Sequence, residues 1–599
     1  MTDYYIGIDV GTGSARAILV GEDGSIVASS TQEIITYRDP EDHRIFEQST
    51  TNIWAAICKT IQECLSDGAV SASSVKGIGF DATCSLAVTN FNGEPVTVTR
   101  GDQLGQHGER NIVLWADHRA EEEAELINST GSEVLDYVGG TMSLEMECPK
   151  MLWLKKHMDP SLFARCQFFD LPDFLTYRAT SDDIRSSCSL TCKCSYIPDK
   201  GWRADFFQKI GLGEFVERNY EPVGAADGSV LTAGMPVGRG LSKKAAQELG
   251  LVEGTPVGSA LIDAYAGWVG TVAARYKENS MLSEPPSIGE SQHRLAVVAG
   301  TSTCHIVQSP AAVFVNGVWG PYKDAVFRSW WMNEGGQSST GQLIEFILTT
   351  HPAYPQLVEQ GKRENKPIHA VLEDILQNLR TERGVETNIE LTKDVHFYPD
   401  FHGNRSPVAD ARMRGSIVGL DLDVSIADLA RKYYLTLESI CLQTRHIIDC
   451  LNAKTSNSPN TSSIPSSRQD HHNISTIYMS GGQAKNRALM QLLADVCKMP
   501  VVLPADSGAA VVLGSAILGR FAREVSDWHA SHEVNNHLSE AEQNEMLWRI
   551  MVNMTPSGVL VAPTATPKEA RLLEAKYDIF HETIGIQKRW RRQMEKAVQ

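Results

Sequence analysis

Two glycine-centred turns interrupt apolar runs of the sequence. The first is Gly11-Thr12-Gly13-Ser14, and the second is Gly300-Thr301-Ser302, which begins 289 positions after Gly11. A turn of this composition presents unpaired backbone N–H groups and hydroxyls, which suit phosphate oxygens. Because the two turns have the same form, we expect them to clamp one polyphosphate from both sides, although each alone also fits an ordinary tight hairpin.

The first turn differs from two other phosphate-binding patterns. A dinucleotide-binding turn would have glycine where Arg16 stands and would continue as a helix, whereas here Ala17-Ile-Leu-Val follows. A Walker-type loop requires Gly-Lys-Ser or Gly-Lys-Thr, and the sequence contains neither. The pattern therefore favours a phosphate site built on a strand, a turn and a second strand.

Two aspartates follow predicted strands. Asp9 stands beside the first turn, where a carboxylate could hold hydrated Mg²⁺ or could cap the turn. Asp263 follows a buried strand predicted over residues 256–261, and α/β proteins place active sites at the carboxyl ends of parallel strands. Asp263 could accept the proton of a hydroxyl that attacks phosphorus, or it could cap a helix.

A third cluster combines carboxylates with an aromatic ring. Asp81, Cys84 and Ser85 follow one predicted strand, and Trp115 and Asp117 follow another. A sugar site needs acceptors for hydroxyl groups and an aromatic face for carbon atoms, so these residues could form one. The alternative is a helix-capping Asp117 beside a packed tryptophan.

The elements that must position these residues alternate between strands and helices. Apolar β-branched runs predict a hairpin over residues 4–20 and a third strand at 26–28, and a similar hairpin follows residue 295. Apolar periodicity predicts helices over 426–451, 484–498 and 242–249. The sequence thus predicts an α/β protein of two related lobes, residues 1–276 and 295–599, joined by a polar connection at 277–294. A Ser- and Asn-rich insert at 454–473, with Asp470-His-His, reads as a surface segment rather than a metal site.

Composition excludes several classes of protein. The formal charge of −18 disfavours a nucleic-acid or membrane binder, since both need basic surface. No secretory signal and no run of about 20 apolar residues is seen. The 12 cysteines are scattered, which is typical of reduced thiols, and the group at 188, 192 and 194 fits no zinc pattern. We expect a cytoplasmic protein, and a homodimer is compatible with its sequence.

Six segments, taken in order, resemble the FGGY carbohydrate kinases nearly from end to end. They are Gly7-Ile-Asp-Val-Gly-Thr-Gly-Ser-Ala-Arg16, Leu114-Trp-Ala-Asp-His-Arg119, Gly254-Thr-Pro-Val-Gly-Ser-Ala-Leu-Ile-Asp-Ala264, Ala299-Gly-Thr-Ser302, Glu334-Gly-Gly-Gln-Ser-Ser-Thr-Gly341 and Gly481-Gly-Gln-Ala-Lys-Asn-Arg487. The resemblance implies a two-lobed, actin-like ATPase fold of the ribonuclease H type, with the active site in the cleft between the lobes. It also implies ATP and a small sugar as substrates, with Mg²⁺ as the metal.

The resemblance implies roles for residues that match the family's motifs. Asp263 matches the catalytic base, and Asp9 matches the carboxylate near Mg²⁺. The ATP-binding positions are Thr12, Gly13, Ser14, Arg16, Gly300, Thr301, Gly341, Gly482 and Asn486. The sugar-binding positions are Asp81, Cys84, Ser85, Trp115 and Asp117.

The substrate expectation comes from two further segments. Phe80-Asp-Ala-Thr-Cys-Ser85 and Phe401-His-Gly-Asn-Arg-Ser-Pro407 look most like the branch that converts D-ribulose to D-ribulose 5-phosphate. Cys84 and Ser85 depart from the pairs found in glycerol kinases and xylulose kinases. The alternatives are another pentulose or polyol, such as L-ribulose or xylulose, and an actin-like ATPase that works as a switch without a sugar.

Overall fold

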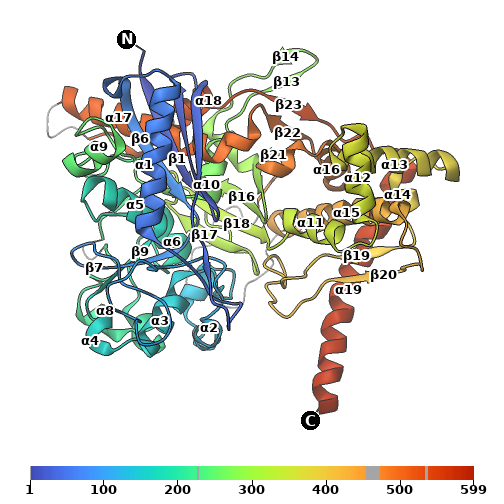
Figure 1. Cartoon of the computed structure of the whole chain (residues 1–599), viewed down its shortest axis with the longest axis horizontal. Coiled ribbons are helices and arrows are strands. Elements are labelled where there is room, and N and C mark those ends of the chain that lie inside the picture. The colour runs from blue at the N-terminus through green and yellow to red at the C-terminus, as the bar shows by residue number, and fades with distance from the viewer. Residues whose placement is uncertain (1, 226–227, 454–471, 533–536, 599) are drawn as a thin grey trace.

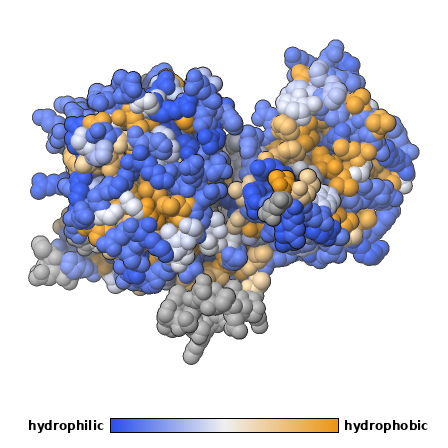
Figure 2. All heavy atoms as spheres, turned by 90° about the horizontal axis from the view of Figure 1, so that it is seen from below, coloured by the Kyte–Doolittle hydropathy of each residue, from blue (hydrophilic) through white to orange (hydrophobic). Residues whose placement is uncertain are grey.

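The computed structural model describes residues 2–225, 228–453, 472–532 and 537–598. Figure 1 shows two bodies, one around β1, β6 and α1 and the other around α12, α13 and α15. Seen from below in Figure 2, the two bodies meet at a waist with a notch beside it. The predicted two-lobed α/β architecture is therefore confirmed.

The first sheet has the strand order β12-β6-β1-β2-β3. The predicted hairpin and third strand are confirmed, and β6 and β12 lie parallel to β1. The carboxyl ends of these three parallel strands therefore meet at one edge. The strands are β1 Tyr4–Val10, β2 Ser14–Gly21, β3 Ile26–Glu33, β6 Val75–Ala82 and β12 Leu261–Ile262.

The strand predicted over residues 256–261 is much shorter in the structure. Only Leu261–Ile262 forms β12, although Val257 makes an isolated bridge with Ile78. Between these two points the chain still lies against β6, because the backbone N–H of Gly258 donates to the carbonyl of Ile78 at 3.0 Å. The backbone N–H of Ser259 points to the other side and donates to the carbonyl of Met235 at 2.8 Å.

The second sheet has nine strands in the order β14-β13-β23-β22-β21-β15-β16-β18-β17. The predicted second hairpin is confirmed as β15 and β16. The segment 277–294 is more ordered than a simple connection, because it contains most of the exposed β13–β14 hairpin at the edge of this sheet. The strands are β13 Tyr276–Glu278, β14 Met281–Leu282, β15 Arg294–Ala299, β16 Thr303–Ser309, β17 Trp319–Lys323, β18 Trp331–Gln337, β21 Thr476–Ser480, β22 Val501–Pro504 and β23 Gly558–Val561.

A third sheet lies beside the first and has the order β4-β5-β8-β7-β9. Its strands are short, and they position the segments that were expected to contact a sugar. They are β4 Tyr37–Arg38, β5 Phe46–Gln48, β7 Leu86–Asn90, β8 Ile112–Val113 and β9 Cys166–Asp170. Two further pairs are β10 Arg185–Ser186 with β11 Val230–Leu231, and β19 His396–Tyr398 with β20 Ser416–Val418.

Helix α17, Ala510–Ser531, packs on the first sheet although it comes late in the chain. A methyl group on Gly7 of β1 would lie 2.0 Å from the carbonyl oxygen of Val512, so glycine permits this close approach. The hydrophobic core of the first lobe therefore includes residues from the second half of the sequence.

The predicted helices are found with small differences. Helix α15 spans Ile426–Asn452 and α9 spans Lys243–Leu249, each capped by the preceding serine. Helix α16, Arg487–Cys497, begins later than predicted, because residues 482–485 form a 3₁₀ turn and the Asn486 side chain caps the helix. The other helices are α1 Thr50–Asp67, α2 Glu121–Asn128, α3 Glu147–His157, α4 Pro160–Phe163, α5 Leu171–Thr180, α6 Ser187–Lys193, α7 Ala204–Ile210, α8 Gly213–Glu217, α10 Asp263–Val269, α11 Gly341–Thr349, α12 Tyr354–Glu364, α13 Ile368–Arg383, α14 Asn388–Leu391, α18 Glu540–Met554 and α19 Pro567–Val598.

The insert predicted at 454–473 falls outside the described residues except for its last two positions. Of these, His472 is buried and its Nε2 lies 2.9 Å from Oδ1 of Asn333. Within the described part of the chain, no group of three or more His, Cys, Asp or Glu residues is placed to hold a metal ion. No described helix has the length and apolar character needed to cross a bilayer, and all 12 cysteines are free thiols.

Candidate active site

A cavity of about 330 Å³ lies between the turns of the two large sheets. The first lobe contributes the turn at Gly11–Thr12 and the residues that follow β6 and β12, while the second contributes Gly300–Ser302 and Gly481–Gly482. The structure thus brings the two glycine-centred turns to the same space. Of the sites predicted from sequence, Asp9, Thr12, Arg16, Cys84, Trp115, Asp263, Gly300, Thr301 and Gly482 line this cavity.

Asp263 is the first residue of α10 and follows β12 directly. Its Oδ1 accepts a hydrogen bond from the backbone N–H of Ala264 at 2.7 Å. Burial, and then the nearby charge of Asp9, raises the pKa of Asp263 to about 7. A carboxyl group with this pKa can accept and release a proton near neutral pH.

Asp9 and Asp81 lie side by side, because they are register partners in β1 and β6. Arg16 donates from Nε to Oδ2 of Asp9 at 3.0 Å and from Nη1 to the carbonyl of Gly508 at 3.3 Å. Asp81 is fully buried, and its Oδ2 accepts a hydrogen bond from the hydroxyl of Ser515 at 2.5 Å. Burial and the charge of Asp9 raise the pKa of Asp81 well above its ordinary value. Asp81 is not among the residues that line the cavity.

The remaining predicted ATP positions lie around the cavity rather than on its wall. Gly13 and Ser14 belong to the first turn, and a methyl group on Gly13 would meet no atom within 4 Å. Gly341 donates its backbone N–H to the carbonyl of Gly300 at 3.2 Å, so it supports the second turn. Asn486 caps α16 and donates to the hydroxyl of Tyr433 at 2.8 Å.

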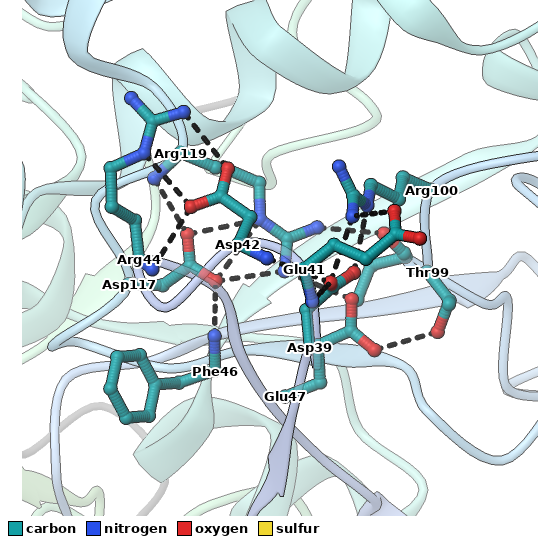
Figure 3. Close-up of polar contacts among 11 residues, drawn as sticks. Asp39, Glu41, Asp42, Arg44, Phe46, Glu47, Thr99, Arg100, Asp117 and Arg119 are labelled. Atoms are coloured by element: carbon teal, nitrogen blue, oxygen red, sulfur yellow. Dashed lines mark hydrogen bonds and ion pairs between the residues drawn. The ribbon is translucent and has the colours of Figure 1, made fainter.

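The predicted sugar positions separate into two groups. Cys84 and Trp115 line the cavity, and Ser85 lies beneath them, where its Oγ accepts the backbone N–H of Trp115 at 3.2 Å. Asp117 is fully buried outside the lining, and its oxygens accept hydrogen bonds from Arg119 and from the backbone N–H of Phe46 (Figure 3). The structure therefore gives Asp117 protein partners and does not place it on the cavity wall.

Four charged residues on the cavity wall were not singled out from sequence. Lys193 ends α6, and its Nζ lies 3.8 Å from Oε2 of Glu334 on β18. Arg405 pairs with Glu334 and lies 3.7 Å from Glu145. The ring of Trp319 lies beneath both cations, 4.3 Å from Lys193 and 3.9 Å from Arg405.

The sequence held only part of the signal for these residues. Glu334 and Arg405 belong to segments that carry the family resemblance, but nothing in their spacing marks them as buried charges. Lys193 and Glu334 each expose about 2% of their side chains, and buried charges of this kind require partners or a function. Only the packing of β17, β18 and α6 reveals that they face the cavity.

The two halves of the chain each match a family model. Residues 4–202 match the N-terminal domain of the FGGY family of carbohydrate kinases, and residues 295–523 match its C-terminal domain. Among relatives, the D-ribulokinase of Saccharomyces cerevisiae is 43% identical over 550 residues, which cover 88% of this chain and 72% of that protein. An FGGY carbohydrate kinase domain-containing protein of Homo sapiens is 38% identical over 98% of this chain and 97% of its own length.

Solved structures share the fold at low sequence identity. A ligand-bound xylulose kinase from Lactobacillus acidophilus aligns with a TM-score of 0.70 at 17% identity, over 98% of each chain. Plasmodium falciparum glycerol kinase with ADP aligns with a TM-score of 0.67 at 15% identity, over 97% of this chain and 98% of that one. The fold is the two-domain, actin-like ATPase fold of sugar kinases, and the chain belongs to the FGGY family of carbohydrate kinases.

Proposed function

We propose that this protein transfers the γ-phosphoryl group of ATP to the terminal hydroxyl of D-ribulose, giving D-ribulose 5-phosphate. One observation supports the reaction most strongly. Asp263, whose pKa is raised to about 7, faces a cavity that also contains both glycine-centred turns. The similarity to a yeast D-ribulokinase supports the choice of sugar.

In the proposed reaction, the turns at Gly11–Thr12 and Gly300–Ser302 hold the phosphates of ATP through backbone N–H groups and hydroxyls. The carboxylate of Asp263 accepts the proton of the sugar hydroxyl as its oxygen attacks the γ-phosphorus. The bond between the γ-phosphorus and the bridging oxygen breaks, and ADP leaves with the electron pair. Positioning and charge neutralisation by the protein supply most of the rate.

The cavity residues divide the recognition of a sugar between polar and aromatic groups. Lys193 and Arg405 supply donors, and Glu334 supplies acceptors, for hydroxyl and carbonyl oxygens. Trp115 supplies an aromatic face for carbon atoms. These charged groups are buried, so an incorrectly placed hydroxyl would leave one of them without a partner, and this gives the site a means to select among sugars.

The donor set at the first turn also fits Mg²⁺. Asp9 presents its carboxylate to the cavity, and Mg²⁺ in nucleotide sites takes one or two carboxylates together with phosphates and water. When bound, the ion would neutralise phosphate charge. Asp9 is now paired with Arg16, so we propose that Arg16 balances its charge before the nucleotide arrives.

A panel assay tests the proposal. ADP release with Mg-ATP is compared for D-ribulose, L-ribulose, D-xylulose, L-xylulose, ribitol and glycerol, and the phosphorylated carbon is identified by NMR. Selective turnover of D-ribulose at its terminal hydroxyl is the expected result. Turnover of another sugar would overturn the substrate proposal but keep the reaction, and ATP hydrolysis unaffected by every sugar would favour the ATPase switch.

A further inference from the structure

Trp115 touches both the predicted sugar side and the phosphate side of the cavity. Its indole Nε1 donates a hydrogen bond to Oγ1 of Thr12 at 3.0 Å, and both residues line the cavity. Its backbone N–H donates a hydrogen bond to Oγ of Ser85, the residue after Cys84 on the predicted sugar side. One side chain therefore connects the place proposed for the sugar with the first phosphate turn.

Strand β5 contacts the same two places, one through a side chain and the other through its backbone. Gln48 donates from Nε2 to the carbonyl of Thr12 at 2.8 Å. The backbone N–H of Leu114, the neighbour of Trp115, donates to the carbonyl of Phe46 at 3.1 Å. Because β5 spans only Phe46–Gln48, a shift of the Trp115 segment would be transmitted to Thr12 over a short distance.

A buried ion-pair cluster holds this arrangement, and Figure 3 shows how its members point toward one another. Arg119 donates from Nε and Nη2 to Asp117, from Nη2 to Glu47 at 2.9 Å and from Nη1 to the carbonyl of Val98 at 2.8 Å. Asp117 also accepts the backbone N–H of Phe46 at 2.8 Å. Asp117, Arg119 and Glu47 are at most 6% exposed, so removing one partner would leave a buried charge uncompensated.

We propose that Trp115, through its hydrogen bond to Thr12, couples sugar binding to nucleotide binding, and that Asp117 and Arg119 are positioning residues that hold Trp115 in place. The proposal rests on the sugar-kinase function proposed above. A sugar that packs against Trp115 would favour the indole position that supports Thr12, and a nucleotide on Thr12 would favour the same position. The coupling is therefore reciprocal: each ligand tightens the binding of the other by the same factor.

The test is a double-mutant cycle on the two atoms of the hydrogen bond. Trp115→Phe keeps an aromatic face but removes the indole N–H, and Thr12→Val removes the acceptor. The affinity for D-ribulose is measured by calorimetry with and without a non-hydrolysable ATP analogue. The enhancement is the factor by which the ATP analogue raises the affinity for D-ribulose. One lost hydrogen bond corresponds to about a fivefold change in affinity, so each single variant should lower this enhancement about fivefold. The double variant should lower it no further.

A second readout does not depend on the sugar. Addition of the ATP analogue alone should change the indole fluorescence of Trp115, seen as the difference between wild type and Trp115→Phe, and Thr12→Val should abolish that change. Asp117→Asn should reduce the same signal if it folds, which a melting curve checks. Arg100→Gln is the matched control, because Arg100 pairs with Asp39 and Glu41 at the exposed side of the cluster in Figure 3.

Two results would overturn the inference. One is an unchanged enhancement in Trp115→Phe and Thr12→Val, and the other is a nucleotide-induced fluorescence change that persists in Thr12→Val. Either could occur in a protein that still phosphorylates D-ribulose, so failure of the coupling is distinguishable from failure of the proposed function. If no sugar in the panel is bound, the fluorescence readout alone decides on the Trp115–Thr12 contact.

Discussion

At the scale of single residues, Asp263 determines the expected dependence of activity on pH. Its pKa is raised to about 7, chiefly by burial and then by Asp9. A general base acts in its ionised form, so kcat/KM for the sugar should rise about tenfold per pH unit below pH 7 and level off above it. Initial rates between pH 5 and 9, with nucleotide binding measured in parallel, check this. A flat profile between pH 5 and 7.5 would contradict it.

The buried carboxyl group of Asp263 should also lower the free energy of unfolding at high pH. An unfolded aspartate titrates near pH 3.9, so between about pH 4 and 7 the folded chain retains a proton that the unfolded chain has released. Stability of the wild type therefore falls as the pH rises through this window. Asp263→Asn stays neutral, and its free energy of unfolding should exceed that of the wild type by about 1 kcal/mol or more at pH 8 and by less at pH 5.

Melting temperatures of wild type and Asp263→Asn at the two pH values measure this difference. An equal difference at pH 5 and pH 8 would mean that burial of the Asp263 charge is not its cause. Ser515→Ala is a useful comparison, because it removes the donor of the neighbouring Asp81 and leaves Asp263 unchanged.

Lys193 should affect the sugar rather than the nucleotide. Its ammonium group lies beside Glu334 on the cavity wall and is about 2% exposed. Lys193→Met keeps most of the side-chain volume but removes the charged donor, whose hydrogen bonds contribute about 1.5–3 kcal/mol. We expect the sugar kcat/KM to fall about 10- to 100-fold with the KM for ATP within about twofold. Lys200→Met is the matched control, because Lys200 is an exposed partner of Glu133. Equal changes for both substrates would contradict this role.

At the scale of elements, the close contact between α17 and the first sheet should be sensitive to added volume. Gly7→Ala would place a methyl group 2.0 Å from the Val512 carbonyl, and such overpacking costs about 1–3 kcal/mol. A lower melting temperature is therefore expected. Gly585→Ala in α19 is the matched control, because no atom lies within 4 Å of its added methyl group. An unchanged melting temperature for Gly7→Ala would contradict the packing described.

The elements also show what local sequence can predict. Both hairpins, α9 and α15 follow from apolar periodicity and capping residues, which act over a few positions. The strand at 256–261 was predicted too long, because only Leu261 and Ile262 form a regular ladder with β6, whereas the residues before them make isolated bonds to Ile78 on one side and Met235 on the other. The position of α17 on the first sheet depends on Gly7 and Val512, which are far apart in sequence, so no local pattern contains it.

At the scale of the whole molecule, the cavity exists only because segments from both halves meet. The two glycine-centred turns and Asp263 could be proposed as site residues from sequence because each follows a strand, and the carboxyl ends of parallel strands share one edge. Lys193, Glu334 and Arg405 could not be assigned a place on the cavity wall, because their meeting depends on tertiary packing. The sequence spacing also did not reveal that the carboxylate of Asp117 accepts hydrogen bonds from Arg119 and from the backbone N–H of Phe46. Its role as a sugar ligand stays a prediction, and the positioning role proposed above is the alternative.

The most direct test of the central claim compares wild type with Asp263→Asn. Formation of D-ribulose 5-phosphate is followed by ³¹P NMR, and the affinity for D-ribulose is measured by calorimetry on the same samples. The account predicts that wild type forms the product and that the variant binds the sugar within about threefold of wild type but turns over about 10²–10⁴-fold more slowly, as expected for loss of a general base. A variant that keeps nearly the full rate would show that Asp263 only caps α10, and the proposed mechanism would be wrong.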